Sequence, residues 1–519
     1  MATVVALQRE RETIQTDEYS RLDIVDGQQR LTTLILLCKA IEKSLDETDK
    51  TEMALRREIA NLLVKNEAGT LLLLQTNHDK STYFANYLRK GILPDPEKAT
   101  FLADRDLAGA IVDCEEFVRS WMSESSLLDL ATLLKNRLTF IFHEINDESA
   151  VYTVFEVLNS RGLDVAWLDR AKSTLMAIAF EHSSKARVSE VIDELHQVWG
   201  DIYATIGLRQ GLGSETLRFA ATLINPDRTS KVLGDENAME VIRKCCDGKV
   251  QRTIDLTKWL LNVAQAVDKL LANRRLAAVT KISHARLLAV SIILAPFSSE
   301  NQEQVLKQWE KVTFRIFGIA RKDARTKVGE YVRLAQRIHG MKGASRDCKE
   351  AINYLRELGD GEYAIEEAMK TLQKEDCYTD WKEELRYFLF RYEEGLARAA
   401  GQRFNNEQWE RIWEASAARS IEHVHPQNPT PGGAWRGALG RGRGQKEAHV
   451  NRLGNLVLLP PGLNSQLGNR AFADKKTEYR KTGFLLLGEV CRKRRWNKQA
   501  IEEREKALFN FALGEWGDL

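Results

Sequence analysis

An acidic residue beside a histidine, followed at a distance by two asparagines, forms the most chemically promising set in the sequence. Glu422 and His423 are neighbours in a short apolar segment, and Asn455 and Asn464 come later. A neutral imidazole can deprotonate water, and carboxylate and amide oxygens suit Mg²⁺ or Mn²⁺, so these residues could hydrolyse a phosphodiester with a divalent metal. By itself, a Glu-His pair is more often structural than catalytic.

The position of this pair on a strand decides whether both side chains can act on one substrate. Neighbouring residues of a strand point to opposite faces, so Glu422 and His423 share a target only where the strand ends or bulges. Pro426 follows closely and is consistent with such an ending.

The residues around this pair resemble the HNH (ββα-metal) nucleases, in particular the C-terminal HNH domain of GmrSD-type modification-dependent restriction enzymes and of the defence nuclease SspE. The resemblance implies that His423 is the general base and that Glu422 and Asn464 ligate Mg²⁺ or Mn²⁺. It also implies that Asn455 either orients the imidazole or ties the two strands of a hairpin together. The matching residues are Glu422-His423-Val424-x-Pro426-Gln427, Leu453-Gly454-Asn455-Leu456-x-Leu458-Leu459, Asn464, and Phe472-x-x-Lys475 with Tyr479.

The charge of the chain is unevenly distributed. The formal net charge is +2, yet residues 436–500 hold 15 Lys or Arg and four Asp or Glu, a local net charge of +11. Nucleic acid is the commonest partner of such a segment, because binding releases counterions from phosphates; a solvated basic helix is the alternative. The residues expected to bind DNA are Arg452, Lys475, Lys476, Arg492, Arg494 and Arg495. His425 is either a surface histidine or a phosphate contact, and His449 could bind phosphate, although its spacing does not require it.

A second polar motif lies near the N-terminus, between a short predicted strand over 21–25 and a predicted helix. Its residues are Asp26, Gly27, Gln28, Gln29 and Arg30, and apolar residues at helical spacing follow from Leu31 to Leu45. The first turn of a helix favours a phosphate, and Arg30 could clamp it through two hydrogen bonds. An Asp-Gly turn before an ordinary amphipathic helix is the alternative. The sequence contains no GxxxxGK[ST] loop, which excludes a conventional P-loop NTPase.

This motif resembles the ParB/sulfiredoxin-like domain of the same GmrSD and SspE proteins, in which DGQQR is tied to the binding and hydrolysis of GTP or another nucleotide. Further matches lie within 72–84 and 154–172. Family members usually carry a Gln-Arg-x-Tyr/Phe-x-Trp motif upstream, whereas Gln8-Arg9 is followed by Arg11 and Thr13. The sequence is therefore expected to begin late, which leaves nucleotide hydrolysis open and allows for a partner subunit or a homo-oligomer.

The arrangement of helical and strand patterns predicts an α+β, mostly helical protein. We expect a ParB/sulfiredoxin-like domain over 1–180, a helical domain over 181–400 and a ββα-metal (HNH) domain over 401–519. Leu256, Leu260, Val263, Val267 and Leu270 share one predicted helix face, and 138–145 is a second strand candidate. The sequence has no apolar run long enough to cross a membrane, and its scattered cysteines favour a reducing cytoplasm.

Together these patterns predict a metal-dependent DNA endonuclease of modification-dependent restriction or phage defence, open to regulation by a nucleotide. Its substrate would be modified phage or other foreign DNA. The alternatives are a noncatalytic DNA-binding or regulatory subunit of a defence complex, and an HNH enzyme that acts on RNA or without regard to modification.

Overall fold

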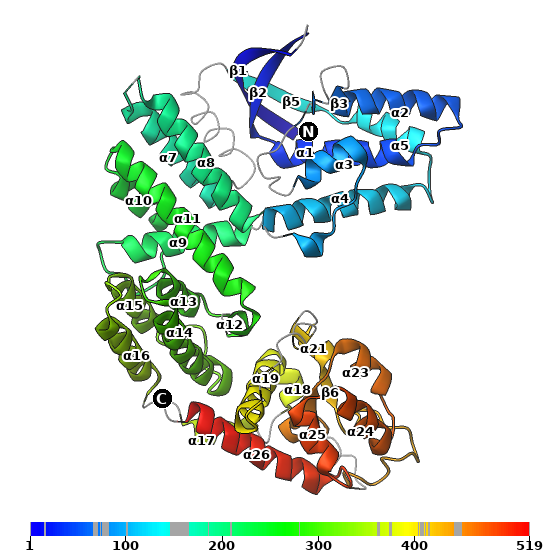
Figure 1. The fold of residues 1–519 in the computed structure, drawn as a ribbon, viewed down its shortest axis with the longest axis vertical. Helices are drawn as coiled ribbons and strands as arrows, with labels where there is room; N and C mark the ends of the chain where they lie inside the picture. Colours follow the sequence, from blue (N-terminus) through cyan, green and yellow to red (C-terminus); the bar gives the residue numbers. More distant parts are fainter. Residues whose placement is uncertain are drawn as a thin grey trace. The chain divides into compact units, whose positions relative to one another are not determined.

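The chain folds into two compact units, shown as ribbons in Figure 1. The first unit combines Met1–Pro226 with Leu233–Asp268, and the second combines Asp227–Val232 with Lys269–Leu519. Both are mostly helical and carry small sheets, which confirms the predicted α+β class. The predicted division into three domains stays a prediction. This computed structural model describes residues 2–14, 17–65, 71–72, 74, 82–99, 102–145, 166–184, 186–207, 210–279, 281–360, 364–372, 376–402, 404, 409, 412–413, 416–440 and 449–517.

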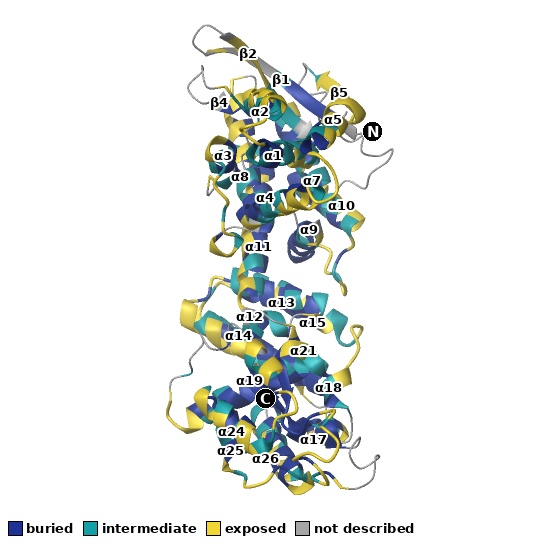
Figure 2. Cartoon of the chain, turned by 90° about the vertical axis from the view of Figure 1, so that its right-hand side faces the viewer, coloured by how far each residue is buried: buried dark blue, intermediate teal, exposed yellow. Residues whose placement is uncertain are grey.

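The first unit contains a three-stranded sheet in the order β2-β1-β5. The central strand β1 (Ala2–Ile14) is antiparallel to β2 (Asp17–Asp26) and parallel to β5 (Phe140–Ile145). Strands β2 and β5 were predicted from the sequence, whereas β1 was not. Figure 2 shows the buried residues of β1 in dark blue and the exposed edge strand β5 in yellow.

The helices of the first unit pack mainly around α1, which follows the sheet directly. Buried residues of α1, among them Leu36 and Ile41, contact Phe84 and Tyr87 of α3 and Ile111 of α4 in one hydrophobic cluster. The helices in this part of the unit are α1 (Gln28–Ser44), α2 (Lys50–Leu63), α3 (Tyr83–Lys90), η1 (Pro96–Lys98), α4 (Leu102–Trp121) and α5 (Leu127–Arg137), with a short pair of strands β3 (Val64–Lys65) and β4 (Leu71–Leu72).

The remainder of the first unit is helical, as the sequence predicts. It consists of α7 (Trp167–His182), α8 (Val188–Ile206), α9 (Gln210–Ile224), α10 (Asp235–Cys246) and most of α11 (Val250–Ala272). The five apolar residues assigned to one face of α11 are all buried, and Leu260 and Val263 have no exposed surface. The amphipathic pattern therefore marks the packed face of this helix correctly.

The second unit begins with helices that support the C-terminal region. They are α12 (Arg274–Ala278), α13 (Ser283–Leu294), α14 (Ser299–Thr313), the π-helix η2 (Phe314–Ile319), α15 (Val328–His339), α16 (Ser345–Gly359), α17 (Ile365–Leu372), α18 (Cys377–Asp380) and α19 (Lys382–Ala399). Glu393 of α19 is buried and accepts hydrogen bonds from the backbone N–H groups of Leu485 and Leu486, at 2.7 Å each. This contact anchors the first turn of a C-terminal helix on α19.

A two-stranded hairpin lies at the centre of the C-terminal region. Strand β6 (Ile421–His423) is antiparallel to β7 (Leu456–Leu458), with His423 opposite Leu456. The short helices α21 (Ala417–Ser420) and η3 (Leu453–Asn455) precede the two strands, and α23 (Pro461–Leu467) follows the hairpin, in the strand-strand-helix order that the sequence predicts. The chain ends with α24 (Phe472–Lys481), α25 (Leu485–Arg492) and α26 (Lys498–Trp516).

Gly454 shows why the predicted Leu-Gly-Asn motif needs a glycine. A Cβ atom at this position would lie 2.2 Å from the backbone oxygen of Ile501 in α26. Only a residue without a side chain allows η3 to approach α26 so closely.

None of the helices in the described residues combines the length and the apolar character that a membrane span requires. All seven cysteines are free thiols.

Candidate active site

His423 lies at the end of β6, in a largely enclosed position. The residue is 8% exposed, and its ring meets the ring of Tyr378 from α18 edge-on, with 4.5 Å between the centroids. Burial lowers the pKa of His423 to about 4; Lys475 and His425 act in the same direction, and the hydrogen bond to Asn451 and the charge of Asp376 oppose them. The imidazole is therefore neutral at neutral pH, as a general base must be.

A chain of two polar side chains holds the imidazole. The Nε2 atom of His423 lies 2.8 Å from Oδ1 of Asn451, and Nδ2 of Asn451 donates to Oδ2 of Asp376 at 2.7 Å. Gln427 also donates to Oδ1 of Asn451, at 3.0 Å. Asn451 and Asp376 were not predicted as site residues from the sequence. No motif marks them, because they join His423 only through the tertiary fold.

Asn455 has no exposed surface, and the hydrogen bonds of its side chain go to groups other than the imidazole of His423. Its Oδ1 accepts hydrogen bonds from the backbone N–H of His425 and from the indole of Trp496, at 2.8 Å each. Its Nδ2 donates to the backbone oxygens of His425 and Val450, at 3.0 and 2.7 Å. Of the two roles considered for Asn455, these contacts correspond to tying the hairpin together. The residue that contacts the imidazole is Asn451.

Glu422 points away from His423, as the alternation of a strand requires. Its Oε1 accepts hydrogen bonds from Nζ of Lys475 at 2.6 Å and from the hydroxyl of Tyr479 at 3.1 Å. Nζ of Lys475 also donates to the backbone oxygen of His423 at 2.8 Å. Burial raises the pKa of Glu422 and lowers that of Lys475, so each charge depends on its partner.

These contacts do not suit the predicted role of Glu422 as a metal ligand. A cation at this carboxylate would face the ammonium of Lys475, which has no exposed surface. Asn464 is placed differently: its Nδ2 donates to the backbone oxygens of Arg419 and Ile421, at 2.9 and 3.0 Å, and its amide oxygen is the atom available for a ligand. Among the described residues, no group of three His, Cys, Asp or Glu side chains forms a metal site. The roles of Glu422 and Asn464 as metal ligands stay predictions.

The six predicted DNA-binding residues fall into two groups. Arg452 forms a two-point ion pair with the buried Glu505, and Lys475 is enclosed, so the cationic groups of both are engaged by carboxylates of the domain. Lys476 is half-buried and donates to the backbone oxygen of Lys493 at 3.1 Å. The exposed members are Arg492, Arg494 and Arg495, at the end of α25 and just after it.

The two other histidines of this region are buried, which corrects the expectation that His425 lies on the surface. His425 is 2% exposed, and its ring packs edge-on against Trp435 with 4.9 Å between the centroids. His449 is 6% exposed, and its Nε2 lies 3.8 Å from a carboxylate oxygen of Glu502. Neither ring is placed as a surface contact for phosphate.

The N-terminal motif forms the turn between β2 and α1. Gly27 adopts a left-handed conformation with φ of +91°, which favours glycine. Gln28 and Gln29 are exposed, and Arg30 is half-buried. Gly27 is the N-cap residue of α1 and has no side chain to cap the helix. The side chain of Asp26 lies outside the described residues, as do most of the supporting matches within 72–84 and 154–172.

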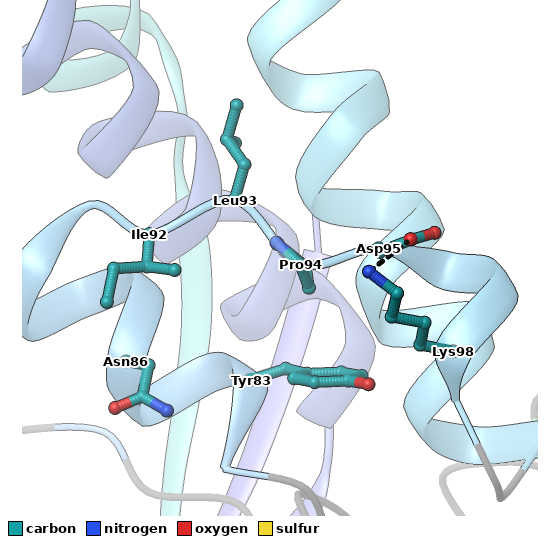
Figure 3. Close-up of a pocket in the computed structure, with 7 residues that line it drawn as sticks. All are labelled: Tyr83, Asn86, Ile92, Leu93, Pro94, Asp95 and Lys98. Atoms are coloured by element: carbon teal, nitrogen blue, oxygen red, sulfur yellow. Dashed lines mark ion pairs between the residues drawn. The ribbon is translucent and has the colours of Figure 1, made fainter.

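A surface hollow of about 300 Å³ lies elsewhere in the first unit, between α3 and the following loop (Figure 3). Its lining is Tyr83, Asn86, Ile92, Leu93, Pro94, Asp95 and Lys98. The carboxylate of Asp95 is 3.3 Å from the ammonium of Lys98, so its two charges are paired with each other. None of the residues Asp26 to Arg30 lines this hollow.

Comparison with protein families places the chain among the nucleases of restriction systems. The N-terminal domain of the GmrSD restriction endonucleases matches residues 2–176, and their C-terminal domain matches residues 364–511. These matches span more than half of the 519 residues, so the chain belongs to the GmrSD restriction endonucleases. Membership implies an endonuclease that acts on DNA. A search of curated proteins found no match. The C-terminal match includes Asp376 and Tyr378 as well as the hairpin.

Proposed function

We propose that the C-terminal region cleaves DNA as an HNH-type endonuclease, with His423 as the general base. One observation carries this proposal: a buried histidine at the end of the hairpin is kept neutral, and a side chain holds one of its ring nitrogens. The family match supports the activity class, and the strand-strand-helix order supports the HNH type.

In the proposed reaction His423 takes a proton from water as the water oxygen attacks the phosphorus of a DNA phosphodiester. One P–O bond forms, and the bond to the leaving sugar oxygen breaks. The nitrogen that accepts the proton is Nδ1, because Asn451 occupies Nε2. Arg492, Arg494 and Arg495 are proposed to bind the DNA backbone by charge, since their exposed guanidinium groups suit phosphates.

A divalent cation, Mg²⁺ or Mn²⁺, remains part of the proposal on the strength of the family resemblance. Mg²⁺ often keeps several waters and binds one or two protein oxygens together with substrate phosphates. Asn464 is the candidate protein ligand, because Lys475 already engages Glu422.

The decisive experiment compares the wild-type protein with His423→Ala on supercoiled plasmid in Mg²⁺ or Mn²⁺. We expect the variant to lose cleavage by about 10³-fold and to keep its affinity for DNA, because a general base contributes about 10²–10⁴-fold. His143→Ala is a suitable control, since His143 lies on the exposed strand β5. Cleavage retained by His423→Ala would refute the assignment. DNA binding without cleavage by the wild-type protein would favour a noncatalytic regulatory subunit.

We further propose that the N-terminal domain regulates cleavage by binding GTP or another nucleotide, or by reading a DNA modification. Support comes from the turn at Gly27, which leads directly into the first turn of α1, where a phosphate is favoured. Arg30→Ala is expected to weaken nucleotide binding, measured by calorimetry with GTP and ATP. Arg57→Ala, an exposed arginine of α2, serves as the control. Cleavage of plain and modified plasmid, with and without nucleotide, would show which signal matters.

A further inference from the structure

We infer that Asp376 and Asn451 are positioning residues that fix the tautomer of His423, with the proton on Nε2 and the lone pair on Nδ1. This inference rests on the proposed function of His423 as the base. Neither residue belongs to the hairpin: Asp376 precedes α18, and Asn451 precedes η3. The hairpin motif thus depends on a carboxylate 47 residues before His423 in the sequence.

The direction of each hydrogen bond follows from the first member of the chain. A carboxylate can only accept, so Asp376 requires the NH₂ group of Asn451 to face it. The amide oxygen of Asn451 must then face His423, and an oxygen accepts only from a protonated ring nitrogen. Gln427 donates to the same oxygen and adds to this preference. The neutral ring consequently keeps its lone pair on Nδ1.

Asp376 is itself held in place by a second contact. Its Oδ1 accepts the backbone N–H of Thr379 at 2.8 Å and caps α18, while Oδ2 receives Asn451. The same short helix supplies Tyr378, whose ring packs against the imidazole. Asn451 and Tyr378 therefore contact the imidazole ring. Asp376, Lys475 and His425 influence it through their charges.

The substitution Asp376→Asn is expected to change the tautomer of His423 while the shape of the site stays the same. Asparagine caps a helix as well as aspartate, and capping keeps the amide oxygen on Thr379. The new NH₂ group then faces Asn451, whose amide must turn over and present its own NH₂ group to Nε2. The proton moves to Nδ1, and the base is lost. We expect cleavage to slow by about 100-fold with an unchanged dissociation constant for DNA, in the range seen when an orienting partner is altered.

A second substitution should restore the tautomer of His423, and with it the cleavage activity that Asp376→Asn removes. In Asp376→Asn/Asn451→Asp, the carboxylate at position 451 accepts from all three neighbours: the amide at 376, Gln427 and Nε2 of His423. Cleavage should return to within about 10-fold of the wild type. Asn451→Asp alone places two carboxylates together and should remain impaired. Asp380→Asn makes the same charge change at the exposed end of α18 and is expected to cleave normally.

The tautomer itself can be measured without cleavage, by ¹⁵N NMR of the full chain labelled at histidine, with His423 assigned by comparison with His423→Ala. We expect a protonated Nε2 in the wild type and in the double variant, and a protonated Nδ1 in Asp376→Asn. A protonated Nδ1 in the wild type, or wild-type turnover in Asp376→Asn, would overturn the inference. Failure of the proposed function looks different: cleavage would survive in His423→Ala, or be absent from the wild type, whatever the tautomer.

Discussion

The two faces of strand β6 treat their polar residues in opposite ways. On one face, the carboxylate of Glu422 accepts hydrogen bonds from Lys475 and Tyr479, and the ammonium of Lys475 balances its charge inside the domain. On the other face, His423 stays neutral and keeps one ring nitrogen for chemistry. Adjacent residues of one motif thus differ in role: Glu422 takes part in a buried ion pair, and His423 is the proposed general base.

This difference has a physical origin in what each face is packed against. The Glu422 face meets α24, which supplies an ammonium with no exposed surface, and a buried carboxylate is stable only beside such a partner. The His423 face meets α18 and Asn451, which supply an aromatic ring and a neutral amide. A carboxylate in direct contact would raise the pKa of the imidazole more strongly than a neutral amide, which orients the ring and leaves it free to take up a proton.

The largest effect is expected on the Glu422 face. Lys475→Met should lower the free energy of unfolding by about 3–5 kcal/mol, because it leaves a buried carboxylate without its partner. Urea unfolding followed by tryptophan fluorescence would measure this, since Lys475 lies 5.8 Å from the ring of Trp435. Lys476→Met is the matched control and should cost far less. The double variant Glu422→Gln/Lys475→Met should recover much of the lost stability. Unchanged stability in Lys475→Met would show that the Glu422 face does not depend on this ion pair.

The acid side of the pH profile tests the His423 face. With a pKa of about 4, roughly 90% of His423 is neutral at pH 5, whereas an ordinary histidine with a pKa of about 6.5 would be roughly 3% neutral. Cleavage at pH 5 should therefore be about 30-fold faster than an unshifted base would allow. A rate that halves near pH 6.5 would show that the ring is not held neutral.

The same pKa shift links His423 to stability. Between about pH 6.5 and pH 4 the unfolded chain binds a proton that the folded protein does not, so this contribution to stability falls as the pH drops through that range. Replacing His423 with glutamine should flatten the dependence of the unfolding free energy on pH within the same range.

The salt dependence of DNA binding tests the proposed DNA surface. The lysine of the Glu422 face is enclosed, so the exposed arginines are expected to provide the contacts with phosphate. Changing Arg492, Arg494 and Arg495 together to alanine should reduce the salt slope of DNA binding by up to about 2.7, about 0.9 for each phosphate contact. Fluorescence anisotropy at several salt concentrations would measure it. Alanine at Arg325, Arg346 and Arg356, three exposed arginines of the same unit, removes equal charge. An equal loss in that control would point to net charge alone.

The smallest effect is expected at Asn464. If its amide oxygen helps to hold the cation, Asn464→Ala should raise the Mg²⁺ concentration needed for half-maximal cleavage by about five-fold, as a metal that keeps most of its waters loses only one protein contact. Asn469→Ala, at an exposed position shortly after α23, is the control. An unchanged metal titration would argue against a ligand role for Asn464.

Helical segments and two of the strands of the N-terminal sheet were predictable, because their apolar spacing reports the packed face directly. The five apolar residues of α11 illustrate this, since all are buried as the period requires. Strand β1 escaped prediction because it is central: Val4, Val5, Ala6 and Leu7 are buried in succession, so the alternation of a half-exposed strand is missing.

By itself the sequence determined the family, the hairpin with its histidine, and the basic C-terminal segment, since these depend on residues close together in the chain. The tertiary structure alone decided what each polar side chain does. Lys475 and Arg452 are cations by composition, and only packing shows that Glu422 and Glu505 engage them inside the domain. Asp376 and Asn451 reach His423 because folding brings distant segments within hydrogen-bonding distance, and the direction of a hydrogen bond depends on such neighbours instead of on sequence spacing.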